Sequence, residues 1–132
     1  PEYCDGMWRM LQHPSAEDFV LATGETHSVR EFVTETFADL GICIEWQGTG
    51  PDEKGVVQRI DESVLGDIYG IHDIQIHNGN VVVEIDPTYL RPTEVDTLMG
   101  DASKAKNLLG WEAKIRFKEL TRIMIAADIK LA

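Results

Sequence analysis

Residues 18–41 read DFVLATGETHSVREFVTETFADLG and contain the clearest secondary-structure signals of this 132-residue chain. The apolar run over 18–24 ends in a glycine, which predicts a short buried strand followed by a turn. Ser28 and Glu31 have the spacing of a capping box, in which each side chain accepts a hydrogen bond from the other residue's backbone amide. We therefore expect a helix that begins there and ends at Gly41. Its apolar face would consist of Val29, Phe32, Val33, Thr36, Phe37 and Leu40.

The remaining elements follow from apolar periodicity and from glycine and proline signals. Residues 42–46, ICIEW, predict a second strand, and a helix followed by a strand favours an α/β fold. Residues 56–79 show no clear period, although Asn78-Gly79 is a strong hairpin-turn signal. The other expected elements are a helix over 2–12, a surface turn over 48–55, a hairpin pairing 73–76 with 81–85, a short strand over 97–100, a helix over 101–109 and a helix over 117–131. The fold class is thus α/β, with short strands and three to four helices.

Apolar stripes on two of these helices are expected to face the core, as stripes at helical spacing usually do. The first contains Tyr3, Met7, Met10 and Leu11, with Trp8 beside them; the second contains Phe117, Leu120, Met124, Ala127 and Leu131. Trp111 follows Gly110 and is expected to fold back over the end of the helix at 101–109.

Composition restricts the class of ligand. The net charge of −11 makes nucleic acid a poor partner, because nucleic-acid binding depends on clustered Lys and Arg. No run approaches the roughly 20 apolar residues of a membrane span, and the first residues lack a signal-peptide pattern, so we expect a soluble, cytoplasmic protein without a membrane partner. Cys4 and Cys43 are far apart and show no zinc spacing, so buried free thiols are expected.

Residues 89–96, YLRPTEVD, suggest a ligand site. Pro92 stiffens the backbone at Arg91, and an arginine on a stiff support can give a phosphate or carboxylate two parallel hydrogen bonds. Glu94 could accept hydrogen bonds from sugar hydroxyls. The alternative is a surface turn that carries an Arg–Glu ion pair.

A second candidate site is the turn that leads into the helix at 28–40, because a helix N-terminus can receive an anion. His27 and Arg30 could border such a ligand; alternatively, the turn only caps the helix and Arg30 is solvated. His72 and His77 fit no familiar metal motif, so no metal site is expected.

The sequence offers no reaction centre. It has no GxSxG, no HExxH, no glycine-rich dinucleotide fingerprint and no Tyr-x-x-x-Lys. We therefore expect no catalytic residue and no cofactor-binding residue in this chain.

Several motifs, in order along essentially the whole chain, closely resemble the C-terminal part of the GDP-mannose 4,6-dehydratases, in the extended short-chain dehydrogenase/reductase superfamily. They are TGETHSVREF at 23–32, YLRPTEVD at 89–96, GD at 100–101, KAK at 104–106 and LGW at 109–111. The first two are specific to the dehydratases within the superfamily, whereas LGW is shared more widely.

The resemblance implies an enzyme whose N-terminal Rossmann domain binds NADP and carries the catalytic residues, while a smaller C-terminal domain grips the nucleotide sugar. The reaction of the family is that of a lyase in GDP-fucose biosynthesis, which converts GDP-mannose to GDP-4-keto-6-deoxymannose and water. By resemblance, Arg91 would hold the diphosphate and Glu94 the ribose hydroxyls. Arg30 and His27 would lie near the site.

We therefore expect residues 1–132 to form one nucleotide-sugar-binding domain, without a complete Rossmann domain. It would be a piece of a larger, homo-oligomeric enzyme, and inactive without the missing N-terminal half. Two alternatives stay open. One is a free-standing nucleotide-sugar-binding or regulatory module. The other is an inert remnant that self-associates through the apolar surface that the Rossmann half would otherwise cover.

Overall fold

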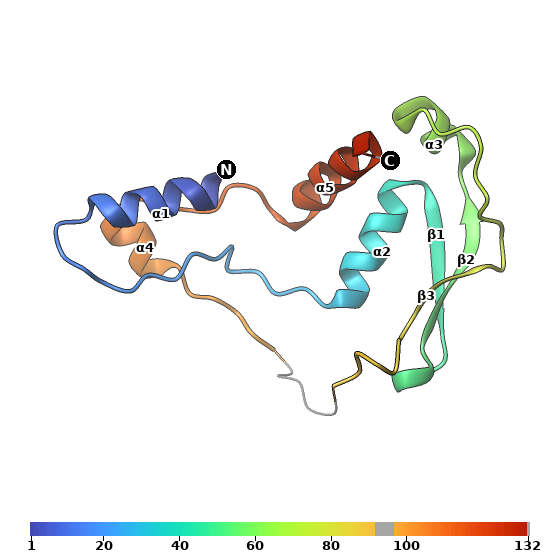
Figure 1. Ribbon diagram of the computed structural model, residues 1–132, viewed down its shortest axis with the longest axis horizontal. Helices are drawn as coiled ribbons and strands as arrows, with labels where there is room; N and C mark the ends of the chain where they lie inside the picture. The colour runs from blue at the N-terminus through green and yellow to red at the C-terminus, as the bar shows by residue number, and fades with distance from the viewer. Residues whose placement is uncertain (92–96, 132) are drawn as a thin grey trace. The chain divides into compact units, whose positions relative to one another are not determined.

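The computed structural model describes residues 1–91 and 97–131, which form two compact units. Of the described residues, 1–27 and 97–120 form the first unit, and 28–91 and 121–131 form the second. Helices and an antiparallel sheet together confirm the expected α/β class (Figure 1). That the two units act as one domain stays a prediction.

The second unit is organised around helix α2, Val29–Asp39, which begins as the sequence predicts. The Ser28 hydroxyl accepts a hydrogen bond from the Glu31 amide at 3.1 Å, and the Glu31 carboxylate accepts one from the Ser28 amide at 2.7 Å. Gly41, at φ +76°, follows the helix end and turns the chain into the sheet. Both predicted helix signals are confirmed.

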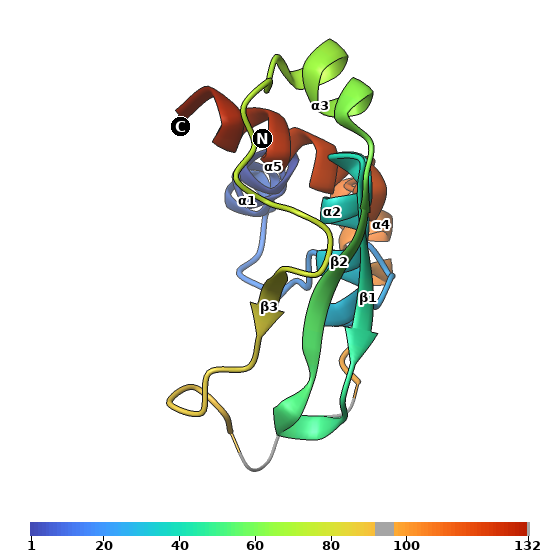
Figure 2. The same cartoon turned by 90° about the vertical axis from the view of Figure 1, so that its right-hand side faces the viewer.

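The sheet of the second unit has three antiparallel strands in the order β1-β2-β3: Ile42–Gln47, Lys54–Ile60 and Val81–Glu84. The predicted strand at 42–46 is confirmed, and the turn after it contains a short 3-10 helix, η1, Gly50–Asp52. Helix α2 runs alongside β1 (Figures 1 and 2). The buried core consists of Ile42, Ile44, Val57 and Leu65, with Val33 and Phe37 of α2 packed against it.

The predicted hairpin is wrong in its pairing. The turn at Asn78-Gly79 is present, but β3 pairs with β2, and 73–76 form no strand. The Gly79 amide donates to the Val57 carbonyl at 2.7 Å, and the Val57 amide donates to the Asn80 carbonyl at 2.9 Å. The edge of β2 thus takes the hydrogen bonds that the sequence assigned to 73–76.

Helix α3, Glu62–Tyr69, lies where the sequence showed no clear period. The Asp61 carboxylate accepts a hydrogen bond from the Ser63 amide at 3.2 Å, and Gly70 ends the helix in the left-handed conformation. Both are ordinary helix boundary signals. They flank a helix of only 8 residues, which is too short to show a convincing apolar period.

The first unit packs helix α1, Glu2–Gln12, against helix α4, Ser103–Leu109. Its buried core is Trp111 with Ala105 and Ala113, and Phe19 and Leu21 pack against them. Gly110 ends α4 at φ +62°, and the Trp111 amide reaches back to the Ala105 carbonyl at 3.3 Å. The prediction that Trp111 folds back over the end of α4 is confirmed.

The strands predicted at 18–24 and 97–100 are wrong, because neither segment belongs to a sheet. The two segments approach each other so closely that a Cβ on Gly100 would lie 2.5 Å from the Ala22 Cβ. Phe19 and Leu21 of the run at 18–24 pack against the core around Trp111. Apolar side chains can be buried in this way without backbone pairing to a neighbouring strand.

Helix α5, Phe117–Leu131, begins in the first unit and continues in the second. Its buried residues are Thr121 and Ile125, whereas Leu120, Met124 and Leu131 of the predicted stripe are exposed. On the predicted apolar face of α1, Met7, Trp8 and Leu11 are likewise exposed, whereas the Tyr3 ring meets the Trp111 ring edge-on at 5.4 Å between centroids. Both predicted helices are present, but the apolar faces that were predicted to be buried are largely exposed. No described helix has the length and apolar character needed to cross a membrane.

Gly41 tests whether the turn after α2 requires glycine. A Cβ there would lie 2.8 Å from the Val64 Cβ, whereas Gly70, also at positive φ, has nothing within 4 Å. We expect Gly70→Ala to lower the free energy of unfolding by about 1–2 kcal/mol, the cost of the left-handed backbone. Gly41→Ala should cost roughly 1–3 kcal/mol more because of overpacking. Equal losses in urea denaturation would contradict this account.

Trp111 and Trp8 form a matched pair for the first unit. Trp111 is 2% exposed and Trp8 is 60% exposed. Trp111→Ala should lower the free energy of unfolding by about 3–5 kcal/mol because it leaves a cavity in the core. Trp8→Ala should change it by no more than about 0.5 kcal/mol. Denaturant unfolding followed by circular dichroism measures both, and a large loss in Trp8→Ala would show that α1 packs differently.

Candidate functional site

The loop that carries the TGETH motif forms a polar cluster in the first unit. The His27 ring stacks on Phe117 with centroids 3.8 Å apart and an interplanar angle of 10°. The His27 Nε2 lies 3.5 Å from a Glu25 carboxylate oxygen, and the other Glu25 oxygen lies 3.4 Å from the Arg116 guanidinium. Arg116 also donates to the Thr23 carbonyl at 2.5 Å. His27 is therefore held flat at the start of α5.

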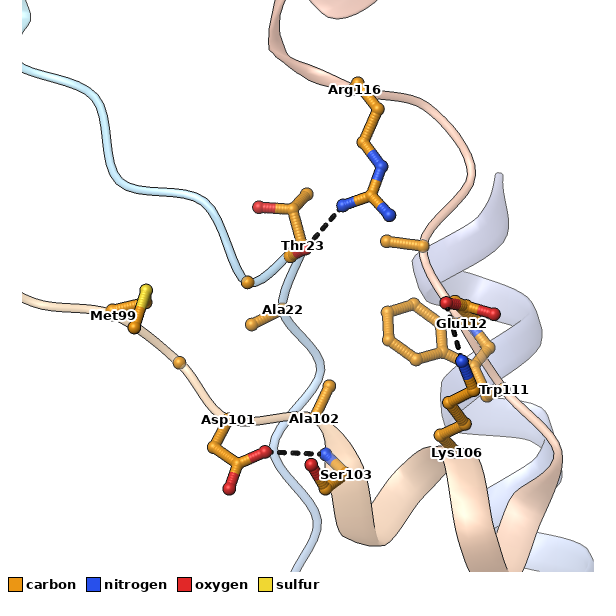
Figure 3. Close-up of a pocket in the computed structure, with 13 residues that line it drawn as sticks. Ala22, Thr23, Met99, Asp101, Ala102, Ser103, Lys106, Trp111, Glu112 and Arg116 are labelled. Carbon is orange, nitrogen blue, oxygen red and sulfur yellow. Dashed lines mark hydrogen bonds and ion pairs between the residues drawn. The ribbon is translucent and has the colours of Figure 1, made fainter.

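A pocket of about 410 Å³ adjoins this cluster (Figure 3). Trp111 lines it together with polar side chains from α4 and from the segment before α5. Figure 3 shows each charged side chain of the pocket with a partner: Arg116 with the Thr23 carbonyl, Lys106 with Glu112 at 2.9 Å, and Asp101 with the Ser103 amide at 2.8 Å. The lining residues are Ala22, Thr23, Gly24, Met99, Gly100, Asp101, Ala102, Ser103, Lys106, Trp111, Glu112, Ala113 and Arg116.

The carboxyl groups of this pocket are poor proton donors. Hydrogen bonds from the Ser103 hydroxyl and amide lower the pKa of Asp101. The hydrogen bond from Lys106, with its positive charge, lowers the pKa of Glu112. A general acid needs a raised carboxyl pKa, so both groups serve as charged hydrogen-bond acceptors at neutral pH. The pocket can recognise polar groups, and it shows no acid/base pair among the residues described.

Arg30 lies in the second unit, in the first turn of α2. Its guanidinium stands over the Trp46 ring at 5.2 Å from the centroid and forms an ion pair with Glu53. The Trp46 indole N–H donates to the Thr34 hydroxyl at 3.0 Å, which fixes the ring against α2. The Arg30 side chain is 53% exposed and that of Glu53 is 17% exposed. The guanidinium is thus oriented and accessible, and an anionic ligand would compete with Glu53 for it.

The remaining predicted site residues are less completely defined. Arg91 is exposed in the second unit, beyond a turn in which the Asp86 carboxylate accepts the Thr88 amide at 2.8 Å. Glu94 lies outside the described residues, so its relation to Arg91 stays a prediction. Arg91 and Arg30 belong to the second unit and His27 to the first.

The sequence did not predict this pocket. Thr23 and Arg116 are 93 positions apart, and although Thr23 begins the TGETHSVREF motif, Arg116 lies in none of the motifs. No local signal could have paired them. Within residues 1–91 and 97–131, no group of three or more His, Cys, Asp or Glu could hold a metal ion.

Asp101 gives the pocket a pH-dependent contribution to stability. Because its pKa in the folded chain lies below the ordinary value of 3.8, the carboxylate stabilises the fold above that value, and this stabilisation is lost as pH falls through the lowered pKa. We expect Asp101→Ala to have a lower Tm than the parent at pH 7, and the difference to shrink below about pH 3.8. Ser103→Ala, which keeps the amide donor, should retain part of this pH dependence. A Tm difference that does not change with pH would contradict the assignment.

Comparison with known proteins places these features in a family. The family described as GDP-mannose 4,6 dehydratase matches residues 1–124. The GDP-mannose 4,6 dehydratase of Dictyostelium discoideum is 44% identical over 98% of this chain and 31% of its own length. The enzymes of that name from Drosophila melanogaster and Homo sapiens are 46% and 44% identical over 98% of this chain, and 28% and 30% of their lengths. The chain spans less than a third of the length of these curated relatives. The resemblance drawn from the motifs is confirmed, and the chain belongs to the GDP-mannose 4,6-dehydratase family.

Proposed function

We propose that this chain forms the nucleotide-sugar-binding, C-terminal portion of a GDP-mannose 4,6-dehydratase. The observation that carries the proposal is the family match over residues 1–124, which includes both the TGETHSVREF and the YLRPTEVD segments. The relatives are named for dehydration of GDP-mannose. The same substrate is proposed here, in a cytoplasmic homo-oligomer.

The geometry around Arg30 supports an anionic ligand. Arg30 is oriented by the Trp46 ring, and Glu53 already places a carboxylate at the guanidinium. A diphosphate carries more negative charge than a carboxylate and can accept the same parallel hydrogen bonds, so it would displace Glu53. In this proposal Arg91 binds the diphosphate with Arg30, Glu94 accepts from the ribose hydroxyls, and His27 borders the site.

NADP would be bound by another portion of the enzyme. A dinucleotide binds at the carboxyl ends of parallel strands, beside a glycine-rich turn. The sheet described here has antiparallel strands only, and the sequence has no such fingerprint. The described residues do not fit NADP, and we assign no hydride-transfer step to them. Dehydration therefore requires a cofactor-binding portion in addition to this chain.

GDP titration of the chain by itself tests how complete the site is. A charge-assisted hydrogen bond contributes about 1.5–3 kcal/mol, whereas micromolar affinity needs about 8 kcal/mol. The net charge of −11 also opposes an anionic ligand. We expect calorimetry to give a Kd of about 1 mM or weaker. Micromolar binding that is lost in Arg91→Ala would instead support a free-standing nucleotide-sugar-binding module.

A chimera tests the proposed roles directly. In it, the aligned segment of the Dictyostelium relative, 31% of that protein, is replaced by this chain. We expect the chimera with NADP to dehydrate GDP-mannose. Arg30→Ala and Arg91→Ala should each weaken GDP binding by about 10–100-fold, since each removes a charged donor. Arg59→Ala, an exposed arginine on β2, is the matched control and should leave binding unchanged. Unchanged GDP binding in both test variants would reject the assignment.

A further inference from the structure

Helix α1 packs on the first unit through its polar and glycine face. Its only buried residue is Gly6. The Glu2 carboxylate accepts the Lys114 amide at 2.9 Å, and the Arg9 guanidinium donates to the Gly110 carbonyl at 2.7 Å. Glu2, Gly6 and Arg9 are spaced by four and three positions, so they lie on one side of the helix. That side faces the rest of the unit.

The opposite side of α1 is apolar and exposed. It carries Cys4, Met7, Trp8 and Leu11, which we call the α1 stripe, whereas Tyr3 lies at its border and meets the Trp111 ring edge-on. Leu11 is 82% exposed and Met7 is 54% exposed. The α1 stripe contains no charged side chain. A helix with its apolar side outward is the reverse of the usual arrangement in a protein that is complete in itself.

The helix cannot turn the α1 stripe inward while its present contacts hold. A Cβ on Gly6 would lie 2.6 Å from the Leu21 Cδ1 and 3.0 Å from the Trp111 Nε1, so a larger residue there would require these side chains to move. The Trp111 indole also donates to the Glu2 carbonyl at 2.8 Å. Rotating α1 would break these contacts and bring large side chains to the position of Gly6. The outward direction of the stripe is therefore built into the unit.

We propose that the α1 stripe is the docking surface for the portion of a family dehydratase to which this chain does not align. This inference rests on the proposed function, since it names where the complementary portion binds. The relatives carry more than two thirds of their length outside the aligned segment, which is ample to cover one helix face. In them the portions are joined in one chain, so the effective concentration of the two surfaces is high.

A second copy of this chain is a poorer occupant. Each copy carries a net charge of −11, and the α1 stripe offers no cation to offset the repulsion between copies. An uncharged, mainly apolar partner surface matches the stripe better. The occupant is thus an apolar face of the complementary portion.

The alkylation rate of the Cys4 thiol measures directly whether the α1 stripe is covered. The prediction of a buried thiol is wrong for Cys4, which is exposed in this chain. Cys43, on β1 and partly buried, provides an internal reference. Alkylation of each thiol is followed by mass spectrometry in the chain alone, at low concentration, and in the chimera with the Dictyostelium relative. We expect Cys4 to react at least about tenfold more slowly in the chimera, because burial blocks access to the thiol. The rate at Cys43 should change far less.

Two exposed leucines give a matched control. Leu11 lies in the α1 stripe, and Leu98, 76% exposed, lies in the same unit outside it. In the chimera, Leu11→Lys should restore rapid alkylation of Cys4, and Leu98→Lys should not. Should the chimera be insoluble, a cysteine placed in the full-length relative at the position aligned with Cys4 gives the same readout.

Equal alkylation of Cys4 in the chain and in the chimera would overturn the proposal. So would protection in the chain alone that grows with concentration and disappears in Leu11→Lys, because a second copy would then be the occupant. Thiol protection does not require GDP to bind. Docking and the proposed function can therefore fail separately: GDP titration of the same chimera reports only on the substrate site.

Discussion

The contact between Gly6 and Trp111 determines the first unit. Trp111 is buried together with Ala105 and Ala113, and its indole N–H donates to the Glu2 carbonyl at the start of α1. A buried indole donor without a partner would be costly, so α1 must lie against the ring. Glycine at position 6 allows that approach without displacing the Leu21 or Trp111 side chains. One hydrogen bond and one missing side chain thus set the orientation of the helix.

The second unit depends on a comparable constraint at the junction between α2 and β1. Gly41 lets the chain reverse, and Val64 and the Asp61 carbonyl fill the space that a side chain at this position would need. The Gly41 carbonyl in turn accepts the Asp61 amide at 2.8 Å. The end of α2 and the start of α3 are therefore brought to the same corner of the sheet. Arg30 and Trp46 are placed by the helix and strand that this corner connects.

Local signals in the sequence predicted local structure correctly. The Ser28–Glu31 cap and the Gly110 helix end involve residues within a few positions, so the sequence contains all that is needed to recognise them. The partner of β3 depends instead on which strand edge is free. The Val57 carbonyl on the β2 edge accepts from the Gly79 amide, and the Val57 amide donates to the Asn80 carbonyl; no local pattern predicts this. For the same reason the sequence could not predict the pocket beside Arg116. Arg30 could be proposed as a ligand-binding residue because it lies at the N-terminus of a predicted helix.

The apolar periodicity of α1 does not predict which surface the helix buries. It showed that α1 has an apolar face, but a helical period says nothing about what covers that face. The face opposite is also well determined, because Gly6 permits close packing and Glu2 and Arg9 satisfy backbone groups at the ends of neighbouring segments. Helix α1 therefore packs on its own unit through Gly6 and through the polar contacts of Glu2 and Arg9. The apolar side chains of the α1 stripe stay available to bind another surface. A helix of this kind is fixed on one side by its own unit and specified on the other by a partner.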